Sequence, residues 1–397
     1  MYGSRLILLA FLALFAMLAT PVLHAQEQAP AGFRSFLAAL WPDAQKRGVS
    51  RATFDGAIRG IAPDEEVLRL TKSQPEYIRP IGDYLKNRLT ANLIAGGKRN
   101  AEKWADTLNA VEKKYGVDKE IIVAIWGLET GYGSFSGGKD VIRSLATLAH
   151  ARYRDDFFRN ELLAALEILE QEHITRDKMK GSWAGAMGQA QFIPSSFLKF
   201  AVDFSGDGRR DIWSNVPDVL GSIGNYLRQH GWKPGLPWGY EVSIPRDFDY
   251  RKSRASFAEW QTLGVRRADS GKFPASGDGI LFFPSGASGP GFVVTGNYEA
   301  IKRYNLSDAY SLTVAGTANR LRGMDAYRGK WPEVIPLNRE QRIRMQKLMQ
   351  AKGYPVNNVV GQIDFDLRDQ IRILQVKFGL LPDGHPTETF LQRLEKL

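Results

Sequence analysis

The sequence contains no cysteine and only five histidines among its 397 residues. Without cysteine, the chain can form no disulfide, no thiolate nucleophile and no cysteine-ligated zinc or iron–sulfur site. No histidine lies in an H-E-x-x-H pattern, which argues against a zinc protease. The sequence also lacks G-x-G-x-x-G and G-x-S-x-G motifs, so it gives no sign of a dinucleotide-binding turn or a nucleophile elbow.

Long hydrophobic runs are equally scarce. The one unbroken apolar run near the N-terminus, residues 6–18, has 13 residues, whereas a bilayer-spanning helix needs about 20. Arg5 precedes this run, and Pro21 and the small Ala25 follow it, as in a secretory signal. We therefore predict a signal peptide over residues 1–25, cleaved near Ala25, and no stable membrane anchor. The alternative is an uncleaved anchor helix.

The remaining composition is that of an ordinary globular protein. Apolar residues make up 44% and charged residues 24% of the chain. Its length is enough for two or three domains of about 150 residues. The 53 basic and 43 acidic side chains give a formal net charge of +10. The basic residues are scattered and form no nucleic-acid-binding signature, so we expect no nucleic acid partner.

Hydrophobic periodicity predicts a mainly α protein. Helical spacing of apolar residues covers four segments, 33–115, 118–130, 155–173 and 218–230. Residues 234–296 change character, because prolines alternate there with short apolar runs at 280–283 and 292–295 that indicate strands. A proline-flanked stretch at 331–336 indicates a linker. Beyond it, residues 337–397 predict three short helices, one with a stripe formed by Leu367, Ile371, Leu374 and Phe378.

The sharpest signal for chemistry is Glu129, near the end of the helix predicted over 118–130. Asp118 is placed to cap that helix, and Gly131 is placed to end it in a left-handed turn. Apolar residues four and eight positions before Glu129 share its face, so the carboxylate is expected to be partly desolvated. It also lies at the negative end of the helix dipole. Both effects favour a raised pKa and a protonated general acid. The alternative is a surface glutamate at a frayed helix end.

A second pattern resembles a phosphate-binding loop but does not satisfy its requirements. Residues 133–139 spell G-x-x-x-x-G-K, yet Asp140 stands where serine or threonine would hold magnesium. The pattern also follows a predicted helix, whereas a phosphate loop follows a strand. We therefore reject a nucleotide site here.

Two long motifs resemble signatures of the lytic murein transglycosylase B family. Residues 125–133, IWGLETGYG, resemble the motif of its catalytic glutamate, and residues 182–196, SWAGAMGQAQFIPSS, resemble its second signature. Later matches surround Tyr226 and lie between Arg303 and Tyr310. The matches follow one another in order from about residue 33 to residue 325. The resemblance implies a mainly α, lysozyme-like catalytic domain over residues 26–330, with a small β-containing insert at about 234–296.

The resemblance also implies an activity, that of a periplasmic peptidoglycan lytic transglycosylase. In that family one glutamate protonates the β-1,4 glycosidic oxygen between N-acetylmuramic acid and N-acetylglucosamine. It then acts as base on the muramyl C6 hydroxyl, which attacks C1 and closes a 1,6-anhydro ring. Ordinary glycosidases need two carboxylates, but here the nucleophile belongs to the substrate. Carried over by position, Glu129 is the acid and base, Ser182 and Gln191 orient the sugar, and Tyr226, Tyr304 and Tyr310 line the groove.

Residues 203–218 resemble a calcium loop. Oxygen-bearing side chains stand at positions 1, 3 and 5, with glycine at position 6, but the glutamate of position 12 is replaced by Ser214. The family resemblance includes an enlarged loop of this kind, with a structural Ca²⁺. Its implied ligands here are Asp203, Ser205, Asp207, the carbonyl of Arg209, and Asp218. The alternative is an Asp/Gly turn that binds no metal.

The last 61 residues, 337–397, resemble a small three-helix peptidoglycan-binding domain. The resemblance rests on Gln346, on the segment from Gln375 to Gly379, and on residues 382–384. A tethered second site of this kind would raise the local concentration of the catalytic domain on an insoluble polymer. The implied partners are peptidoglycan glycan strands, with proteins of cell-wall synthesis or division as further candidates. No organic cofactor is expected.

Two other functions compete with the lytic transglycosylase. A hydrolytic muramidase on a related fold would use water in place of the C6 hydroxyl. A non-catalytic peptidoglycan-binding protein would bind the wall without turning it over.

Overall fold

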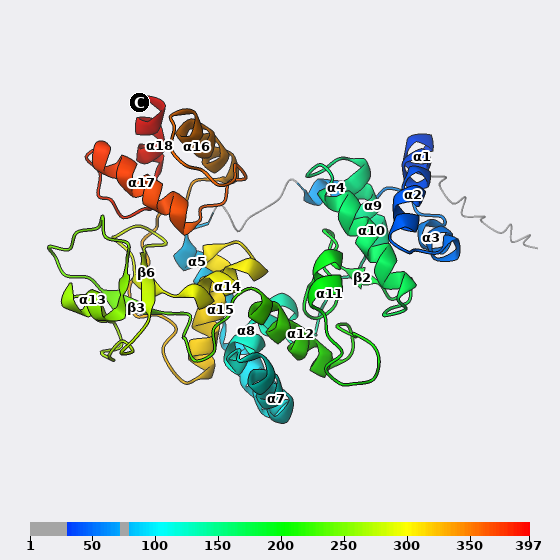
Figure 1. Cartoon of the computed structure of the whole chain (residues 1–397), viewed down its shortest axis with the longest axis horizontal. Helices are drawn as coiled ribbons and strands as arrows, with labels where there is room; N and C mark the ends of the chain where they lie inside the picture. Colours follow the sequence, from blue (N-terminus) through cyan, green and yellow to red (C-terminus); the bar gives the residue numbers. More distant parts are fainter. Residues whose placement is uncertain (1–29, 72–78) are drawn as a thin grey trace, which may run out of the picture.

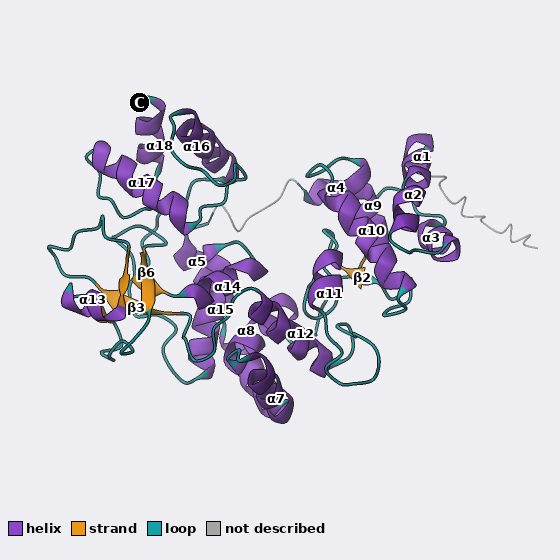
Figure 2. Ribbon diagram, viewed as in Figure 1, coloured by secondary structure: helices purple, strands orange, loops and turns teal. Residues whose placement is uncertain are grey.

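The computed structural model describes residues 30–71 and 79–397, so the predicted signal peptide lies outside the described residues. Helices dominate this part of the chain, and strands are few (Figure 2). The prediction of a mainly α protein is therefore confirmed. Within the described ranges, no helix combines the length and the apolar character needed to cross a bilayer.

One group of helices is built around the pair α9 and α10 (Figure 1). Helices α2, α3 and α11 pack on α10, and α1, α3 and α4 pack on α9. The members are α1 (Ala31–Ala39), α2 (Trp41–Lys46), α3 (Arg51–Ile58), α4 (Glu65–Leu70), α9 (Val141–His150), α10 (Phe157–Glu170) and α11 (Pro194–Phe200).

A second group surrounds α8, which extends from Lys119 to Thr130. Residues 121–127 of α8 are all buried, so this helix needs neighbours on every side. Helices α6, α7, α12 and α15 provide them, while α5 and α14 pack on α15. The bounds are α5 (Ile81–Arg88), α6 (Ala91–Lys103), α7 (Ala105–Tyr115), α12 (Val216–Gln229), α14 (Gly296–Tyr304) and α15 (Asp308–Leu321).

The two ends of α8 differ in how closely they follow the sequence. Gly131 adopts the expected left-handed conformation, with φ of 57°, directly after the helix. Asp118 occupies the N-cap position, but its side chain accepts no capping hydrogen bond. The predicted cap is wrong, because the Asp118 carboxylate instead accepts a 2.6 Å hydrogen bond from Arg322 at the end of α15.

The predicted β-containing insert is a five-stranded antiparallel sheet in the order β4-β6-β7-β3-β5. The strands expected near 280–283 and 292–295 are β6 and β7, which pair with Ile280 opposite Val294. The sheet and α13 enclose a separate small core that includes Phe257 and Trp260. The bounds are β3 (Gly239–Ser243), β4 (Arg254–Ser256), α13 (Phe257–Thr262), β5 (Arg266–Arg267), β6 (Asp278–Phe282) and β7 (Gly291–Val294).

The C-terminal residues form three helices with their own apolar core, to which Leu367, Ile371 and Leu374 of the predicted stripe contribute. Two buried glutamines make the same kind of hydrogen bond to a glycine N–H. Gln346 accepts from the Gly361 N–H at 2.7 Å, and Gln375 accepts from the Gly384 N–H at 2.8 Å. Each glutamine therefore holds a glycine-containing turn against the preceding helix. The bounds are α16 (Arg339–Ala351), α17 (Phe365–Lys377) and α18 (Glu388–Glu395).

The three-helix module is docked on the rest of the molecule. Phe365 belongs to the main core and contacts Phe282 edge-on, with ring centroids 5.4 Å apart. Arg254 at the edge of the sheet pairs with Asp366 at 2.7 Å and Asp369 at 3.0 Å. In the segment predicted as a linker, Trp331 stacks on Phe292 at 6.1 Å. Apolar contacts and ion pairs together fix the module in place.

Candidate active site

Glu129 lies in the last turn of α8, half-buried, where Gly131 turns the chain away. The hydroxyl of Tyr310 donates a 2.5 Å hydrogen bond to its Oε1. Tyr310 lies in the first turn of α15, the helix that packs along α8. The two helices therefore bring together two predicted site residues that are 181 positions apart in the chain.

Tyr310 is set up to donate. Its side chain is buried, and burial together with the nearby Glu129 charge raises its pKa well above the usual value of 10. The phenol therefore keeps its proton at neutral pH. Its position is fixed by the Ser307 N-cap, whose hydroxyl accepts from the Tyr310 N–H.

The other two predicted tyrosines form a layer beside this pair. The rings of Tyr226 and Tyr304 lie 4.7 Å apart. Tyr304 donates to the Ala190 carbonyl at 2.6 Å, and Tyr226 donates to the Arg303 carbonyl at 2.5 Å. Burial raises the pKa of Tyr226 to about 12, and burial and the Glu129 charge raise that of Tyr304 well above 10. Both hydroxyls thus fix backbone segments near Glu129, Tyr226 from a buried position and Tyr304 from a half-buried one.

Ser182 and Gln191 also bond to backbone. The Ser182 hydroxyl accepts from the Ala186 N–H at 3.0 Å. Gln191 adopts a positive φ of 51°. Its side-chain amide donates at 2.9 Å to the carbonyls of Ser136 and Gly188. The predicted sugar-orienting residues therefore shape the loop on which they lie and connect it to the loop that follows Glu129.

Gln189 is a residue that the sequence reasoning missed. It is buried, and its Oε1 accepts from the indole N–H of Trp126 on α8 at 3.0 Å. Its carbonyl accepts from the Thr130 hydroxyl at 3.0 Å. Its amide donates to the Trp213 carbonyl at 2.9 Å. Gln189 thus holds the glutamate helix against the second signature loop. The only available signal was its place inside that signature.

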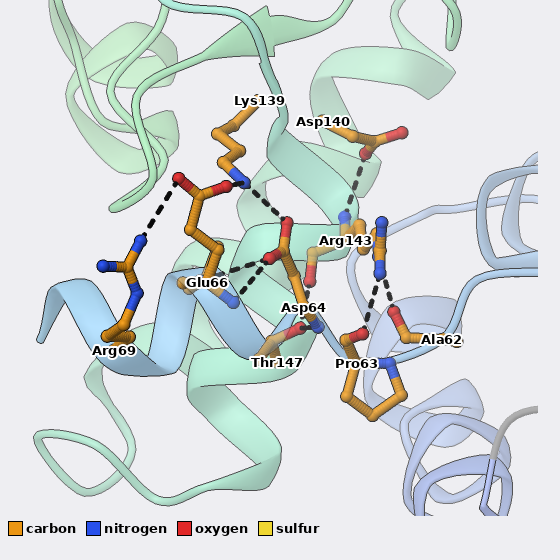
Figure 3. Close-up of polar contacts among 10 residues, drawn as sticks. Ala62, Pro63, Asp64, Glu66, Arg69, Lys139, Asp140, Arg143 and Thr147 are labelled. Carbon is orange, nitrogen blue, oxygen red and sulfur yellow. Dashed lines mark hydrogen bonds and ion pairs between the residues drawn. The ribbon is translucent and has the colours of Figure 1, made fainter.

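The loop between Glu129 and α9 is anchored by a polar network. Lys139, the last residue of the phosphate-loop-like run, pairs with Asp64 at 3.1 Å and with Glu66 at 2.5 Å (Figure 3). Arg143 on α9 donates to the carbonyls of Ala62 and Pro63 (Figure 3). The lysine that a phosphate would need is therefore neutralised by carboxylates.

A two-stranded ladder continues this anchoring toward the second signature. Strand β1 (Lys139–Asp140) pairs antiparallel with β2 (Lys180–Gly181), which leads directly into Ser182. Arg176 adds a 2.8 Å ion pair to Asp140. The loops that carry the two motifs are thus connected by backbone hydrogen bonds as well as by Gln191.

The predicted cation loop brings its acidic side chains together. One carboxylate oxygen from each of Asp203, Asp207 and Asp218 lies within 4.8 Å of the others. Asp218 is fully buried and accepts backbone N–H groups of Phe204 and Ser205, both at 2.9 Å. Oxygen-only donors of this kind suit Ca²⁺. The residues present therefore fit a hard divalent cation.

The other two predicted ligands lie in the same loop. The Ser205 hydroxyl is 3.3 Å from Asp203 Oδ1. The Arg209 N–H donates to Asp207 Oδ1 at 2.9 Å, which orients that carboxylate. The loop is therefore shaped by its own backbone.

Comparisons with known proteins agree with this geometry. Residues 32–319 match the family model described as the transglycosylase SLT domain. Over 292 residues the chain is 33% identical to membrane-bound lytic murein transglycosylase B of Escherichia coli, covering 68% of this chain and 77% of that protein.

Two solved structures extend the comparison. SltB3 from Pseudomonas aeruginosa, in complex with NAG-anhNAM-pentapeptide, is 42% identical, with a TM-score of 0.82 over 92% of this chain and 100% of that one. The Escherichia coli lytic transglycosylase Slt35 in complex with calcium is 28% identical, with a TM-score of 0.61 over 74% of this chain and 93% of that one. With a matching family model over most of its length and a curated relative above 30% identity, the chain belongs to the lytic murein transglycosylase family.

Proposed function

We propose that this lytic transglycosylase cleaves the β-1,4 bond between N-acetylmuramic acid and N-acetylglucosamine in peptidoglycan and leaves a 1,6-anhydromuramoyl end. The observation that carries the proposal is the hydrogen bond from the buried Tyr310 hydroxyl to Glu129. The bond supports the proposal because it holds one carboxylate, in the last turn of α8, with a neutral donor. The relative from Pseudomonas aeruginosa was solved with NAG-anhNAM-pentapeptide, a fragment that carries the anhydro sugar.

In the proposed mechanism, Glu129 performs both proton transfers. Protonated Glu129 donates to the glycosidic oxygen as the bond to muramyl C1 breaks. The resulting carboxylate then accepts the proton of the muramyl C6 hydroxyl, whose oxygen forms the new bond to C1. Tyr310 donates to Glu129 Oε1, which fixes the orientation of the carboxyl group that exchanges the proton. The raised pKa expected for Glu129 remains a prediction.

The experiment is a comparison of Glu129→Gln with wild type on purified sacculi. Glutamine keeps the size and the hydrogen bond but cannot transfer the proton, and general acid–base catalysis contributes about 10²- to 10⁴-fold. We expect turnover to fall by at least that factor while sacculus binding remains. Glu102→Gln, an exposed position on α6, is the matched control.

Mass spectrometry of the products separates the proposal from the alternatives. Anhydromuramoyl ends support the lytic reaction, and reducing muramic ends would identify a hydrolytic muramidase. Wild-type protein that binds sacculi without releasing fragments would instead be a non-catalytic wall-binding protein.

We further propose that Asp203, Ser205, Asp207, Asp218 and the Arg209 carbonyl bind a structural Ca²⁺. The three clustered carboxylates support this, as does the calcium complex of Slt35. A cation that binds only the folded state, present at a free concentration of 100 times its dissociation constant, stabilises that state by about 2.7 kcal/mol. Calcium should therefore raise the melting temperature relative to EGTA, and Asp207→Asn should weaken that response, whereas the exposed Asp278→Asn should not. An unchanged melting temperature would contradict the proposal.

The proposed function also includes a cellular location and a role for the C-terminal residues. Cleavage near Ala25 would deliver the mature chain to the periplasm, and N-terminal sequencing of the exported protein tests this. Residues 337–397 would bind peptidoglycan beside the catalytic domain, with proteins of wall synthesis or division as candidate partners. Sedimentation of the Glu129→Gln variant with sacculi measures wall binding without turnover.

A further inference from the structure

A pocket lies where the three-helix module meets the catalytic domain. Its empty volume is about 690 Å³, which includes space that is open to solvent. The start of α15, from Ser307 to Ala309, forms one wall, and the module contributes Arg342, Arg368 and His385. The pocket therefore exists only when the two parts of the chain are docked together.

Positive charge dominates the pocket. Arg79, Arg342 and Arg368 line it, against one acidic lining residue, Asp308. Asp308 is already neutralised, because Lys302 contacts it at 2.7 Å and Arg368 at 2.8 Å. Both cations hold the pKa of Asp308 below its usual value against the opposing effect of burial. The excess charge favours an anionic ligand.

Two buried side chains in the wall have polar atoms without a protein partner. Both ring nitrogens of His385 and the Nε of Arg368 make no hydrogen bond to any described residue. The two residues are only 7% and 4% exposed. A buried polar group left unsatisfied costs about 1–3 kcal/mol. These atoms have almost no accessible surface, so they lie behind the pocket wall and not on it. Burial lowers the pKa of His385 to about 4, which leaves a neutral ring able both to donate and to accept.

Most of the remaining lining residues are apolar, with Ser307 and Gln362 as the polar exceptions. Ile81, Pro284, Leu306, Ile363 and Pro386 contribute hydrocarbon surface around the polar wall. Such a mixture suits a short chain segment with small side chains that ends in a charged group. A sugar chain, with hydroxyls on every ring, would leave these apolar residues unmatched.

The pocket lies at the start of α15, the helix that also carries Tyr310. Ser307 and Asp308 precede Tyr310 by three and two residues, and Tyr310 contacts Glu129. An α-helix with its side chains is about 10–12 Å across. A fully extended pentapeptide spans about 17 Å. A peptide carried by a sugar bound at Glu129 can therefore pass around the first turn of α15 into the pocket.

We propose that this pocket binds the free carboxylate end of the peptide stem borne by the muramyl sugar. The inference rests on the proposed function, since it assigns part of the same substrate to a second place. The arginines would bind the carboxylate, and the apolar residues would contact the small side chains. The module would then select strands by their peptide end.

Binding of a sugar-free stem pentapeptide to the full chain, measured by calorimetry, tests the pocket directly. We expect the pentapeptide to bind and its C-terminal amide to bind at least tenfold more weakly. Arg79→Glu should weaken binding of the free acid by at least tenfold, because it reverses a charge on an exposed lining residue without disturbing the core. Lys86→Glu, exposed on the neighbouring α5 and outside the lining, is the control.

Three results of the binding experiment would contradict the pocket proposal. No binding of the pentapeptide at millimolar concentration, equal binding of acid and amide, or an Arg79→Glu variant that binds like Lys86→Glu would each do so. Turnover measurements distinguish failure of the pocket proposal from failure of the proposed function. Leu306→Trp, which fills the exposed rim of the pocket, should raise KM for peptide-bearing strands relative to peptide-free strands. Absence of turnover on both substrates in wild type would instead contradict the proposed function.

Discussion

At the scale of single residues, the proposed chemistry depends on one hydroxyl and one carboxylate. The Tyr310→Phe substitution removes the hydroxyl that donates to Glu129 Oε1 at 2.5 Å. Hydrogen bonds to charged groups are worth about 1.5–3 kcal/mol. We therefore expect Tyr310→Phe to lower kcat by roughly tenfold to a hundredfold, with little change in KM because the side chain is buried. Steady-state release of soluble fragments from sacculi measures both constants.

The matched control for this prediction is Tyr250→Phe. Tyr250 packs beside Phe248 and Phe283 in the small core of the sheet. Its substitution by phenylalanine removes a phenolic oxygen, as Tyr310→Phe does. A kcat for Tyr310→Phe equal to that of Tyr250→Phe would show that the bond to Glu129 does not matter for turnover. A fall confined to KM would assign Tyr310 to substrate binding.

The sequence identified most of these residues but not their contacts. Glu129 could be predicted from its place at the end of an apolar helix and from the signature motif, and Tyr310 from a later match. Their hydrogen bond could not, because it joins positions 181 residues apart through the packing of α8 on α15. Gln189 was missed for the same reason. Its partners Trp126 and Trp213 lie on other elements, and nothing local marks the contact.

At the scale of elements, the two motif loops are positioned by a short ladder between β1 and β2. Gly137, just before β1, has a φ of 96°, and a Cβ there would lie 2.2 Å from the Gly181 carbonyl oxygen. Neither the conformation nor the contact tolerates a side chain. We expect Gly137→Ala to lower the free energy of unfolding by about 2 kcal/mol or more, and to reduce turnover because Ser182 follows Gly181.

The neighbouring Gly138 provides the control. A Cβ on Gly138 meets no atom within 4 Å. Gly138→Ala should therefore be neutral or stabilise by about 0.4–1 kcal/mol through the unfolded chain. Denaturant unfolding of both variants checks this. Equal stability of the two variants would mean that the β1–β2 junction tolerates a side chain at position 137. It would contradict a role of this junction in positioning the loop that begins at Ser182.

Elements with a long repeating pattern could be predicted, and those without one could not. The helices of the catalytic domain and the stripe of α17 follow from apolar spacing, and prolines marked the insert that became the sheet. The two-residue strands β1 and β2 are too short to show a period. The cap expected at Asp118 failed because Arg322, far along the chain, attracts that carboxylate, a competition that no local rule includes.

At the scale of the whole molecule, the C-terminal module is docked by contacts that could not be predicted from its sequence. Its own core follows from apolar periodicity, but Phe365 packs into the main core. Arg372 of α17 donates to the Leu281 carbonyl on β6 at 2.9 Å. Asp383 likewise accepts from the Ala287 N–H at 2.9 Å. The docked module and the catalytic domain should therefore share part of their stability.

His385 makes that shared stability depend on pH. Burial and the nearby Arg368 charge lower its pKa from 6.5 to about 4, against the smaller effects of Asp383 and Asp308. Between these two values the unfolded chain binds more protons than the folded chain, so stability falls as the pH falls from 6.5 toward 4. The contribution lost at pH 5 is about 2 kcal/mol. His385→Gln removes the titrating group, so its denaturation midpoint should change less between pH 7 and pH 5 than that of wild type. Parallel midpoints for the two proteins over this range would show that His385 is not buried against the catalytic domain in solution.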